Sequence, residues 1–263
     1  RYRAEPPGIN LMSTIEVEDR QDPSGYSRPG SYLPIDIPAY RAFVRAAVER
    51  YDGDRVDDMP GLTVPIHYWQ VSNEISDNFT GFAQLQAITY TAIKEACADC
   101  QVLIGGVGGM PDGYLDHFNQ VYVPILAALA GQTIDIFDFH WYGDATGDYR
   151  RMEEVLVAIR AAPDQYGFAG APIWVTEMGT YSGDPLEGPN QSWPYQSEEE
   201  QAADLLKRYV FSLSEGIRKV FSAFGLIEGF HDDNTYFDHT GLIYEGRGPD
   251  DRGYGVKKVG YYT

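Results

Sequence analysis

Apolar positions along the chain follow two spacings, which alternate from the N-terminal to the C-terminal end. Short runs rich in β-branched residues predict strands over residues 9–15, 66–74, 102–106, 134–142, 172–178 and 219–226. Between them, apolar residues recur at helical spacing over about 37–51, 82–98, 114–129, 149–161 and 198–214. Alternating strands and helices are typical of parallel strands joined by right-handed crossovers. The pattern therefore predicts an α/β fold.

Two of the predicted helices carry recognisable start signals. Asp36 stands where an N-cap is expected, and Pro38 fits the first turn of the helix that follows. Ser197 and Glu200 have the spacing of a capping box, in which each side chain accepts a hydrogen bond from the backbone N–H of the other residue. After the last predicted strand, the tail at 225–263 is rich in Gly, Asp and Tyr, and we expect it to be mostly loop.

Two α/β architectures fit this alternation, an open doubly wound sheet and a (β/α)8 TIM barrel. An open sheet would be expected to carry a nucleotide-binding glycine motif. The Gly-Gly-Val-Gly-Gly segment at 105–109 lacks the GxGxxG register and the acidic residue about 20 positions further on, so we interpret it as a turn. A barrel places functional residues at the C-terminal ends of its strands, where Glu74, Tyr142 and Glu177 lie. We predict a single barrel domain over 1–263, with about six βα units recognisable.

Two of the predicted strands end in a glutamate where the strand gives way to a loop. The first reads Trp-Gln-Val-Ser-Asn-Glu and ends at Glu74, and the second reads Ile-Trp-Val-Thr-Glu and ends at Glu177. Cleavage of a glycosidic bond uses two carboxyl groups, and a separation of about 5–5.5 Å between them gives retention of configuration. The pair predicts glycosidase chemistry. The alternative is that both glutamates are solvated charges at loop starts.

These residues resemble the motifs of the large clan of retaining glycoside hydrolases built on (β/α)8 barrels. Asn73-Glu74 matches the Asn-Glu at the end of that clan's fourth strand, and Glu177 matches the glutamate that ends its seventh. His140-Trp141-Tyr142 matches the His-x-Tyr often found at the end of the sixth strand. The resemblance implies a retaining β-glycosidase that works by double displacement through a covalent glycosyl-enzyme. It implies no metal and no organic cofactor, and its substrate would be an oligosaccharide, a polysaccharide or a small glycoside.

The resemblance also implies roles for individual residues. Glu177 would be the nucleophile and Glu74 the acid/base. Asn73 would hydrogen-bond the sugar 2-hydroxyl, a contact that strengthens in the transition state. Tyr142 would donate to the nucleophile carboxylate. His140 would line the floor of the site, and a core histidine is the alternative for that residue.

Aromatic residues near these strand ends are candidate platforms for sugar rings. Trp69 and Trp141 lie within predicted strands, where a place in the core is the alternative. Trp193 lies in the Pro-, Gly- and Ser-rich loop that follows the Glu177 strand, and is the better candidate. Phe224 is the aromatic nearest the end of the last strand, where the clan normally has a Trp.

Departures from the clan's pattern leave a second function open. Only one βα unit precedes the strand that ends at Glu74, so the clan's first two strands, and the Arg that the second supplies, have no counterpart. An open remnant would expose parallel edges that barrels abolish. Either the chain is a fragment, or other segments, a partner chain or an oligomer close the barrel. The alternative function is a non-catalytic carbohydrate-binding or assembly protein on a truncated barrel.

Charge and hydropathy narrow the choice of partners. With 20 basic and 39 acidic residues the formal net charge is −19, which disfavours nucleic acid and anionic membrane surfaces. No run approaches the ~20 apolar residues of a membrane span, and the first residues show no signal-peptide pattern. A secreted and a cytoplasmic location both stay open.

Three groups of residues raise the question of a metal or redox site. Cys97 and Cys100 form a CxxC pair, for which a redox motif, half a zinc site and a short-loop disulfide are the alternatives. Because the pair closes a helix before a strand, we favour a structural role. Asp232, Asp233 and Asp238 could bind calcium, but their spacing is not that of an EF-hand, which favours a hydrogen-bonded turn. The five histidines supply no HxH strand motif, which disfavours a metal-dependent hydrolase.

Overall fold

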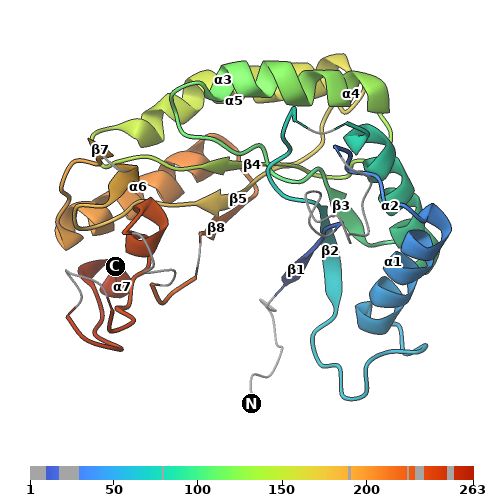
Figure 1. Cartoon of the computed structure of the whole chain (residues 1–263), viewed down its shortest axis with the longest axis horizontal. Helices are drawn as coiled ribbons and strands as arrows, with labels where there is room; N and C mark the ends of the chain where they lie inside the picture. The colour runs from blue at the N-terminus through green and yellow to red at the C-terminus, as the bar shows by residue number, and fades with distance from the viewer. Residues whose placement is uncertain are drawn as a thin grey trace. The chain divides into compact units, whose positions relative to one another are not determined.

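The computed structural model describes residues 10–17, 30–78, 80–188, 191–223, 225–228, 234–247 and 252–263 (Figure 1). Within this part of the chain the backbone forms two compact units. The first unit comprises the described residues up to 108 together with 115–138 and 159–172, and the second comprises 109–114, 139–158 and the described residues from 173 onward. Strand β4 (Phe137–Trp141) and helix α5 (Asp148–Gln165) contribute residues to both units.

A three-stranded parallel sheet forms the centre of the first unit. Its strands are, in sheet order, β1 (Leu11–Ile15), β2 (Ile66–Val71) and β3 (Gln101–Leu103). Trp69 of β2 is paired with Ser13 of β1 on one side and with Val102 of β3 on the other. An isolated parallel bridge then joins Leu103 to Ile136. The predicted parallel pairing is confirmed in this unit.

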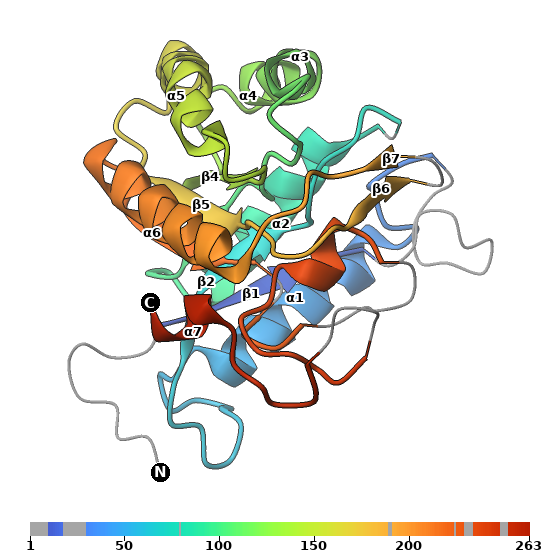
Figure 2. The same ribbon diagram turned by 90° about the vertical axis from the view of Figure 1, so that its left-hand side faces the viewer.

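Helices α1 (Ile37–Tyr51) and α2 (Phe82–Ala96) lie side by side next to this sheet (Figures 1 and 2). The predicted cap of α1 is confirmed, because the Asp36 side chain accepts a hydrogen bond from the backbone N–H of residue 39 at 2.9 Å. The two helices are also joined by a hydrogen bond of 2.8 Å between the hydroxyls of Tyr40 and Thr89.

The helix predicted over 114–129 is interrupted. It consists of α3 (Tyr114–His117), a π-helical turn η1 (Phe118–Tyr122) and α4 (Val123–Leu129). Pro124 stands in the first turn of α4. A proline has no N–H to donate, and its ring clashes with the carbonyl four residues earlier in a regular helix. A wider turn just before the proline accommodates both effects. The apolar spacing predicts helix throughout, because one wide turn hardly changes it.

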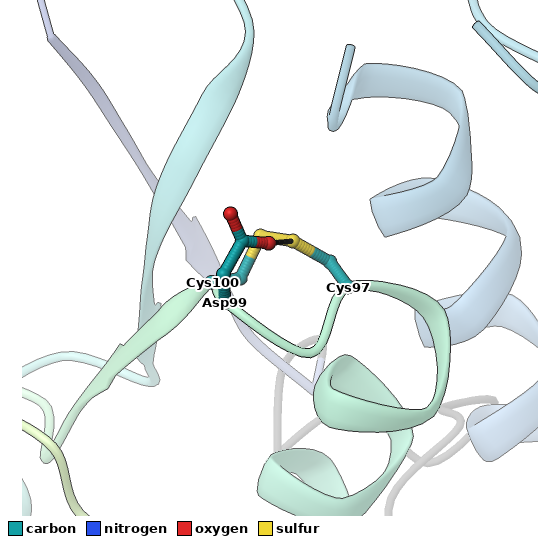
Figure 3. A group of neighbouring side chains, drawn as sticks. All are labelled: Cys97, Asp99 and Cys100. Carbon is teal, nitrogen blue, oxygen red and sulfur yellow. Dashed lines mark hydrogen bonds between the residues drawn. A yellow bond between two sulfur atoms is a disulfide. The ribbon is translucent and has the colours of Figure 1, made fainter. Parts of the chain in front are cut away.

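A disulfide joins Cys97 to Cys100 across the turn between α2 and β3 (Figure 3). Of the alternatives for this pair, the structure has the short-loop disulfide, and both side chains are buried. Because the two sulfurs are bonded to each other, neither is a thiolate that could bind zinc. Lys94 donates a hydrogen bond from Nζ to the carbonyl of Cys100 in the same turn, and Nζ lies 2.8 Å from the carboxylate of Asp135.

The second unit is built around β4, β5 and β8, in that sheet order, with β5 and β8 parallel. Besides its parts of β4 and α5, this unit contains β5 (Ile173–Met178), β6 (Leu186–Gly188), β7 (Gln191–Ser192), α6 (Glu198–Ser214), β8 (Lys219–Ser222), η2 (Tyr236–His239) and α7 (Val259–Tyr262). Figure 2 shows α6 beside α7, with which it packs. The predicted capping box at the start of α6 is confirmed by reciprocal hydrogen bonds between Ser197 and Glu200.

The tail after β8 contains regular structure where the sequence predicts mostly loop. Besides η2 and α7, isolated bridges join Ile243 to Ile227 and to Lys257. Lys258 is almost fully buried. Its ammonium group forms an ion pair with Glu228 and donates to the hydroxyl of Ser182 at 2.8 Å. The described parts of the tail are therefore anchored within the second unit.

The strands of the described residues belong to separate sheets, and no barrel closes among them. The predicted α/β class is thus confirmed, and the closed TIM barrel stays a prediction. No helix in the described ranges combines the length and the apolar character that crossing a membrane requires.

Candidate active site

Glu74 stands just after β2, in the first unit, on an unusual stretch of backbone. Ser72 and Glu74 have φ values of 61° and 45°, in the left-handed region that few residues other than glycine adopt. The turn is held by two backbone hydrogen bonds, from Ser72 N–H to the Ile15 carbonyl (2.8 Å) and from Glu74 N–H to the Gly105 carbonyl (3.0 Å). The Glu74 side chain is exposed, and Asn73, between the two left-handed residues, is partly buried.

Glycines at 105–108 allow the neighbouring turn to approach Glu74 closely. A Cβ on Gly105 would lie 2.3 Å from the carbonyl oxygen of Val71, and a Cβ on Gly108 would lie 2.4 Å from the Glu74 side-chain Cδ. Atoms cannot come so near, so the Val71 backbone requires glycine at 105, and a side chain at 108 would push the Glu74 side chain aside. The segment is a turn, as we interpreted it from sequence. The sequence interpretation missed that the turn lies directly against the predicted acid/base.

Tyr122 joins this glycine turn to the residue after Glu74. Its hydroxyl accepts a hydrogen bond from the backbone N–H of Ile75 (2.9 Å) and donates one to the carbonyl of Gly106 (2.6 Å). Burial raises the pKa of Tyr122 far above its usual range, so the hydroxyl keeps its proton. Tyr122 is the last residue of the π-helical turn η1. No local signal in the sequence marks it as a neighbour of Glu74.

In the second unit, three predicted site residues meet where β4 and β5 end. The side chain of Glu177, near the end of β5, is 26% exposed. Its Oε2 accepts a hydrogen bond from the Tyr142 hydroxyl, and the same oxygen lies 3.3 Å from Nδ1 of His140. His140 and Tyr142 are both buried. They are two residues apart, so the alternation of a strand directs both side chains to one face.

The surroundings of Glu177 fix how its carboxylate is oriented. A tyrosine hydroxyl and an imidazole nitrogen gather on one oxygen, and a hydrogen bond to a carboxylate is stronger and more directional than one between neutral groups. The carboxylate is thereby held from one edge while part of the side chain is accessible. Such a group can attack an electrophilic carbon or bind a polar ligand.

Aromatic side chains surround Tyr142 within the second unit. The buried rings are Tyr142, Tyr181 and Tyr236, and the partly buried side chains that pack against them are Met110, Trp193 and Phe237. The Phe237 ring centroid lies 5.3 Å from that of Tyr142, and the Trp193 centroid lies 5.2 Å from that of Tyr236. Partly exposed rings offer an apolar face to a ligand. Sequence analysis singled out Trp193 but missed Tyr236 and Phe237, because both lie in the tail expected to be loop.

The other aromatic candidates lie elsewhere. Trp141 is fully buried, and its indole N–H donates to the carbonyl of Asp148 at 3.0 Å. Trp69 is also buried. Both therefore have the environment of core residues, the alternative left open for strand tryptophans, and neither offers a face on which a sugar could stack. Phe224 lies outside the described residues.

One of the acidic residues considered for a calcium site lies among the described residues. Asp238 is buried and accepts a hydrogen bond from the backbone N–H of Thr235 at 2.8 Å, as part of the cap of η2. This is the hydrogen-bonded turn favoured from sequence, whereas Asp232 and Asp233 lie outside the described residues.

A second acidic group, which sequence analysis did not single out, follows α1. Carboxylate oxygens of Asp52, Asp54 and Asp58 lie within 4.8 Å of one another. They accept hydrogen bonds from backbone N–H groups of their own turn. Burial raises the pKa of Asp52; the N–H of Asp54 lowers it, and the charges of Asp54 and Asp58 raise it further. These three aspartates therefore form a turn whose carboxylates are hydrogen-bonded to its own backbone.

No protein-family model and no curated protein matches the sequence. Solved structures do resemble the fold. A glucosidase from Croceicoccus marinus has a TM-score of 0.61 at 18% identity, over 94% of this chain and 48% of that chain. A family 39 glycoside hydrolase from Bacteroides cellulosilyticus WH2 has a TM-score of 0.59 at 19% identity, over 88% and 45%. A β-xylosidase from Caulobacter crescentus CB15 has a TM-score of 0.52 at 15% identity, over 87% and 46%.

At these identities the comparisons show the fold alone. The chain has a glycosidase-like α/β fold, and it spans about half the length of the solved structures it matches.

Proposed function

We propose that this chain carries the active site of a retaining β-glycosidase. The observation that carries the proposal is the Glu177 carboxylate, partly exposed near the end of a strand and hydrogen-bonded by Tyr142 on one oxygen. The glycosidase-like fold supports it, since barrel enzymes carry their catalytic residues at the C-terminal ends of strands. The pairing of Glu177 with Glu74 is supported by the strand-end position of both residues and by the resemblance of their motifs.

In the first step, Glu177 attacks the anomeric carbon while the glycosidic C–O bond breaks. Glu74 gives its proton to the leaving oxygen, which departs as an alcohol, and a glycosyl ester forms on Glu177. The Tyr142 hydroxyl holds Oε2 during the attack, so the carboxylate does not have to reorient in the transition state.

In the second step, the ionised Glu74 takes a proton from a water molecule, whose oxygen attacks the anomeric carbon. The ester bond breaks, Glu177 is restored as a carboxylate, and two inversions give net retention. As negative charge returns to Glu177, the Tyr142 hydrogen bond strengthens and favours its departure.

The sugar would be held by polar groups at these strand ends and by aromatic groups of the second unit. Asn73 would contact the 2-hydroxyl, and His140 would stay at the floor of the site because it is buried beside Glu177. The partly buried rings of Trp193 and Phe237 would pack against the apolar face of the sugar. The substrate class is a β-linked oligosaccharide, polysaccharide or small glycoside.

The direct test is trapping with 2-deoxy-2-fluoro glycosides of the common sugars. We expect the intact mass to rise by one fluorosugar and peptide mapping to locate it on Glu177. Glu177→Gln should take up no label, whereas Glu199→Gln, which changes an exposed glutamate of α6, should label like the wild type. Wild-type protein that neither labels nor hydrolyses any of these glycosides would contradict the proposal.

The rival is a non-catalytic carbohydrate-binding protein. It is favoured by the observation that the strands of the described residues lie in separate sheets and close no barrel. Titration calorimetry with the same sugars separates the two functions. Sugar binding without labelling or hydrolysis supports the rival, whereas a covalent label on Glu177 rules it out.

A further inference from the structure

Tyr236, from the tail of the second unit, places its hydroxyl between the backbones that follow β4 and β5. The hydroxyl oxygen lies 2.8 Å from the carbonyl oxygen of Gly143 and 3.0 Å from that of Gly179. It also accepts a hydrogen bond from the N–H of Gly143 at 3.2 Å. The side chain is buried. One phenol group thus links two loops that are far apart in the sequence.

The two linked glycines are neighbours of the groups that meet at the proposed nucleophile. Gly143 directly follows Tyr142, and Gly179 is two residues after Glu177. A Cβ on Gly179 would lie 2.9 Å from the Tyr142 ring, so the Gly179 backbone passes close to that ring. The position of the Tyr142 hydroxyl relative to Glu177 therefore depends on how the two loops are held together.

Tyr236 also contacts Tyr142 directly through its ring. The two ring centroids are 5.8 Å apart, edge to face. Phe237, the next residue, lies edge to face against both Tyr142 and Tyr236. Burial raises the pKa of Tyr236 above its usual value, so the hydroxyl stays protonated and keeps a donor for the two carbonyls.

We propose that Tyr236 is a positioning residue that holds the Tyr142 hydroxyl on the Glu177 carboxylate by linking the backbones at Gly143 and Gly179. The consequence for turnover rests on the proposed function, but the geometric claim does not. Removing the Tyr236 hydroxyl should loosen the contact between Tyr142 and Glu177 while the ring continues to fill the core. Tyr236 acts through Tyr142 and does not itself touch Glu177.

The chain offers a matched control in Tyr181. This tyrosine is buried in the same aromatic group, 5.2 Å from Tyr236 between ring centroids. Its hydroxyl donates instead to the carbonyl of Pro194 at 2.7 Å. Tyr181→Phe therefore removes a buried hydroxyl of the same cluster without touching the link between the two loops.

A spectroscopic test needs no enzymatic activity. Protein labelled with carbon-13 at the glutamate carboxyls shows a Glu177 resonance, identified as the one that Glu177→Gln removes. We expect Tyr142→Phe and Tyr236→Phe to shift this resonance in the same direction, and Tyr181→Phe to leave it in place. A Glu177 resonance in Tyr236→Phe that coincides with the wild type would overturn the proposal.

If Tyr236→Phe does not fold, an amino-acid analogue can carry the same test. A chain with 4-aminophenylalanine at position 236 retains a hydrogen-bond donor at the end of the ring. It should show the wild-type resonance, and a shift as large as that of Tyr142→Phe would overturn the proposal.

A kinetic double-mutant cycle tests whether Tyr236 acts through Tyr142. On an aryl glycoside, we expect Tyr236→Phe to lower kcat about tenfold with little change in KM, and to have no further effect in a Tyr142→Phe background. If the rate losses of Tyr236→Phe and Tyr142→Phe multiply in the double variant, Tyr236 does not act through Tyr142. That result would overturn the inference. If the wild type shows no turnover but the predicted resonance shifts are observed, the glycosidase proposal is contradicted. The positioning role of Tyr236 is then still supported.

Discussion

The hydroxyl of Tyr142 donates a hydrogen bond to Oε2 of Glu177, the same oxygen that lies 3.3 Å from Nδ1 of His140. Tyr142 follows β4 and Glu177 belongs to β5, so the contact joins two neighbouring strand ends of the second unit. In the proposed reaction Tyr142 holds this oxygen while one oxygen of the Glu177 carboxylate forms the new bond to the anomeric carbon.

Tyr142→Phe should therefore weaken catalysis without unfolding the protein. A hydrogen bond to a charged group contributes about 1.5–3 kcal/mol, so we expect kcat to fall by about 10- to 100-fold. Steady-state kinetics on an aryl glycoside measure the loss, and Tyr195→Phe, which alters a highly exposed tyrosine, is the control. Equal rates in Tyr142→Phe and wild type would mean that this contact plays no part in turnover.

Gly108→Ala should displace the Glu74 side chain. The added Cβ would lie 2.4 Å from Cδ of Glu74, an exposed side chain that can move aside, so we expect the melting temperature to change little. Hydrolysis of substrates with poor leaving groups should fall far more than that of activated aryl glycosides, because only the former need a well-placed acid. Glu74→Ala should show the same selectivity in stronger form.

The control for the Gly108→Ala prediction is the double variant that combines Gly108→Ala with Glu74→Ala. In a Glu74→Ala background the Gly108→Ala change should have no further effect, because the group it displaces is already gone. A further loss of rate would show that Gly108 acts on something other than Glu74.

Reducing the disulfide between Cys97 and Cys100 should lower stability and leave the chemistry intact. The bond closes a loop of only four residues, for which loop-closure entropy predicts a contribution of about 2 kcal/mol to the free energy of unfolding. Urea denaturation of Cys97→Ala/Cys100→Ala measures it, and dithiothreitol should destabilise the wild type but not the variant. A loss of activity at unchanged stability would point to a redox role.

Asp52→Asn should stabilise the protein at neutral pH. Burial is the main cause that raises the pKa of Asp52, so the folded state binds the proton more tightly than the unfolded state does. The resulting stability is present at low pH and is lost as the pH rises through the folded-state pKa, where the buried carboxylate ionises. Asparagine stays neutral and can still accept from the N–H of Asp54.

The pH dependence separates burial from net charge. The gain in melting temperature from Asp52→Asn should be present at pH 7 and vanish below about pH 4, the ordinary range for an aspartate. Asp57→Asn removes an exposed charge from the same turn, so it should give a smaller gain. Equal gains from the two variants would mean that charge repulsion, and not burial of Asp52, sets the effect.

The features that could be predicted from the sequence depend on local patterns. Hydrophobic periodicity is a local property, and it located the helices and the parallel strands. The two-residue alternation of a strand predicts that His140 and Tyr142 share a face. Hydrophobic periodicity could not predict the π-helical turn before Pro124, because a single wider turn hardly disturbs the helical spacing of apolar residues.

The residues that hold the backbone near Glu74 and Glu177 come from segments distant in the sequence. The Tyr122 hydroxyl reaches Ile75 across 47 residues, and the Tyr236 hydroxyl reaches Gly143 across 93. A glycine-rich turn such as 105–109 indicates a turn from sequence, but only the path of the folded chain shows that Glu74 lies against it. For the same reason, strand position alone could not decide whether Trp141 faces the core or the ligand.

The buried ammonium group of Lys258 has a consequence for handling the protein. Lys258 is the N-cap residue of α7, and its ammonium group is held by Glu228, Ser182 and the carbonyl of His239. A protease cut on the N-terminal side of Lys258 would separate from the preceding chain the cation that faces Glu228. The carboxylate would then be left in a place from which water is excluded. We expect cleavage at this position to unfold the protein. A trypsin digest should then show the intact chain and small fragments, with no stable intermediate product.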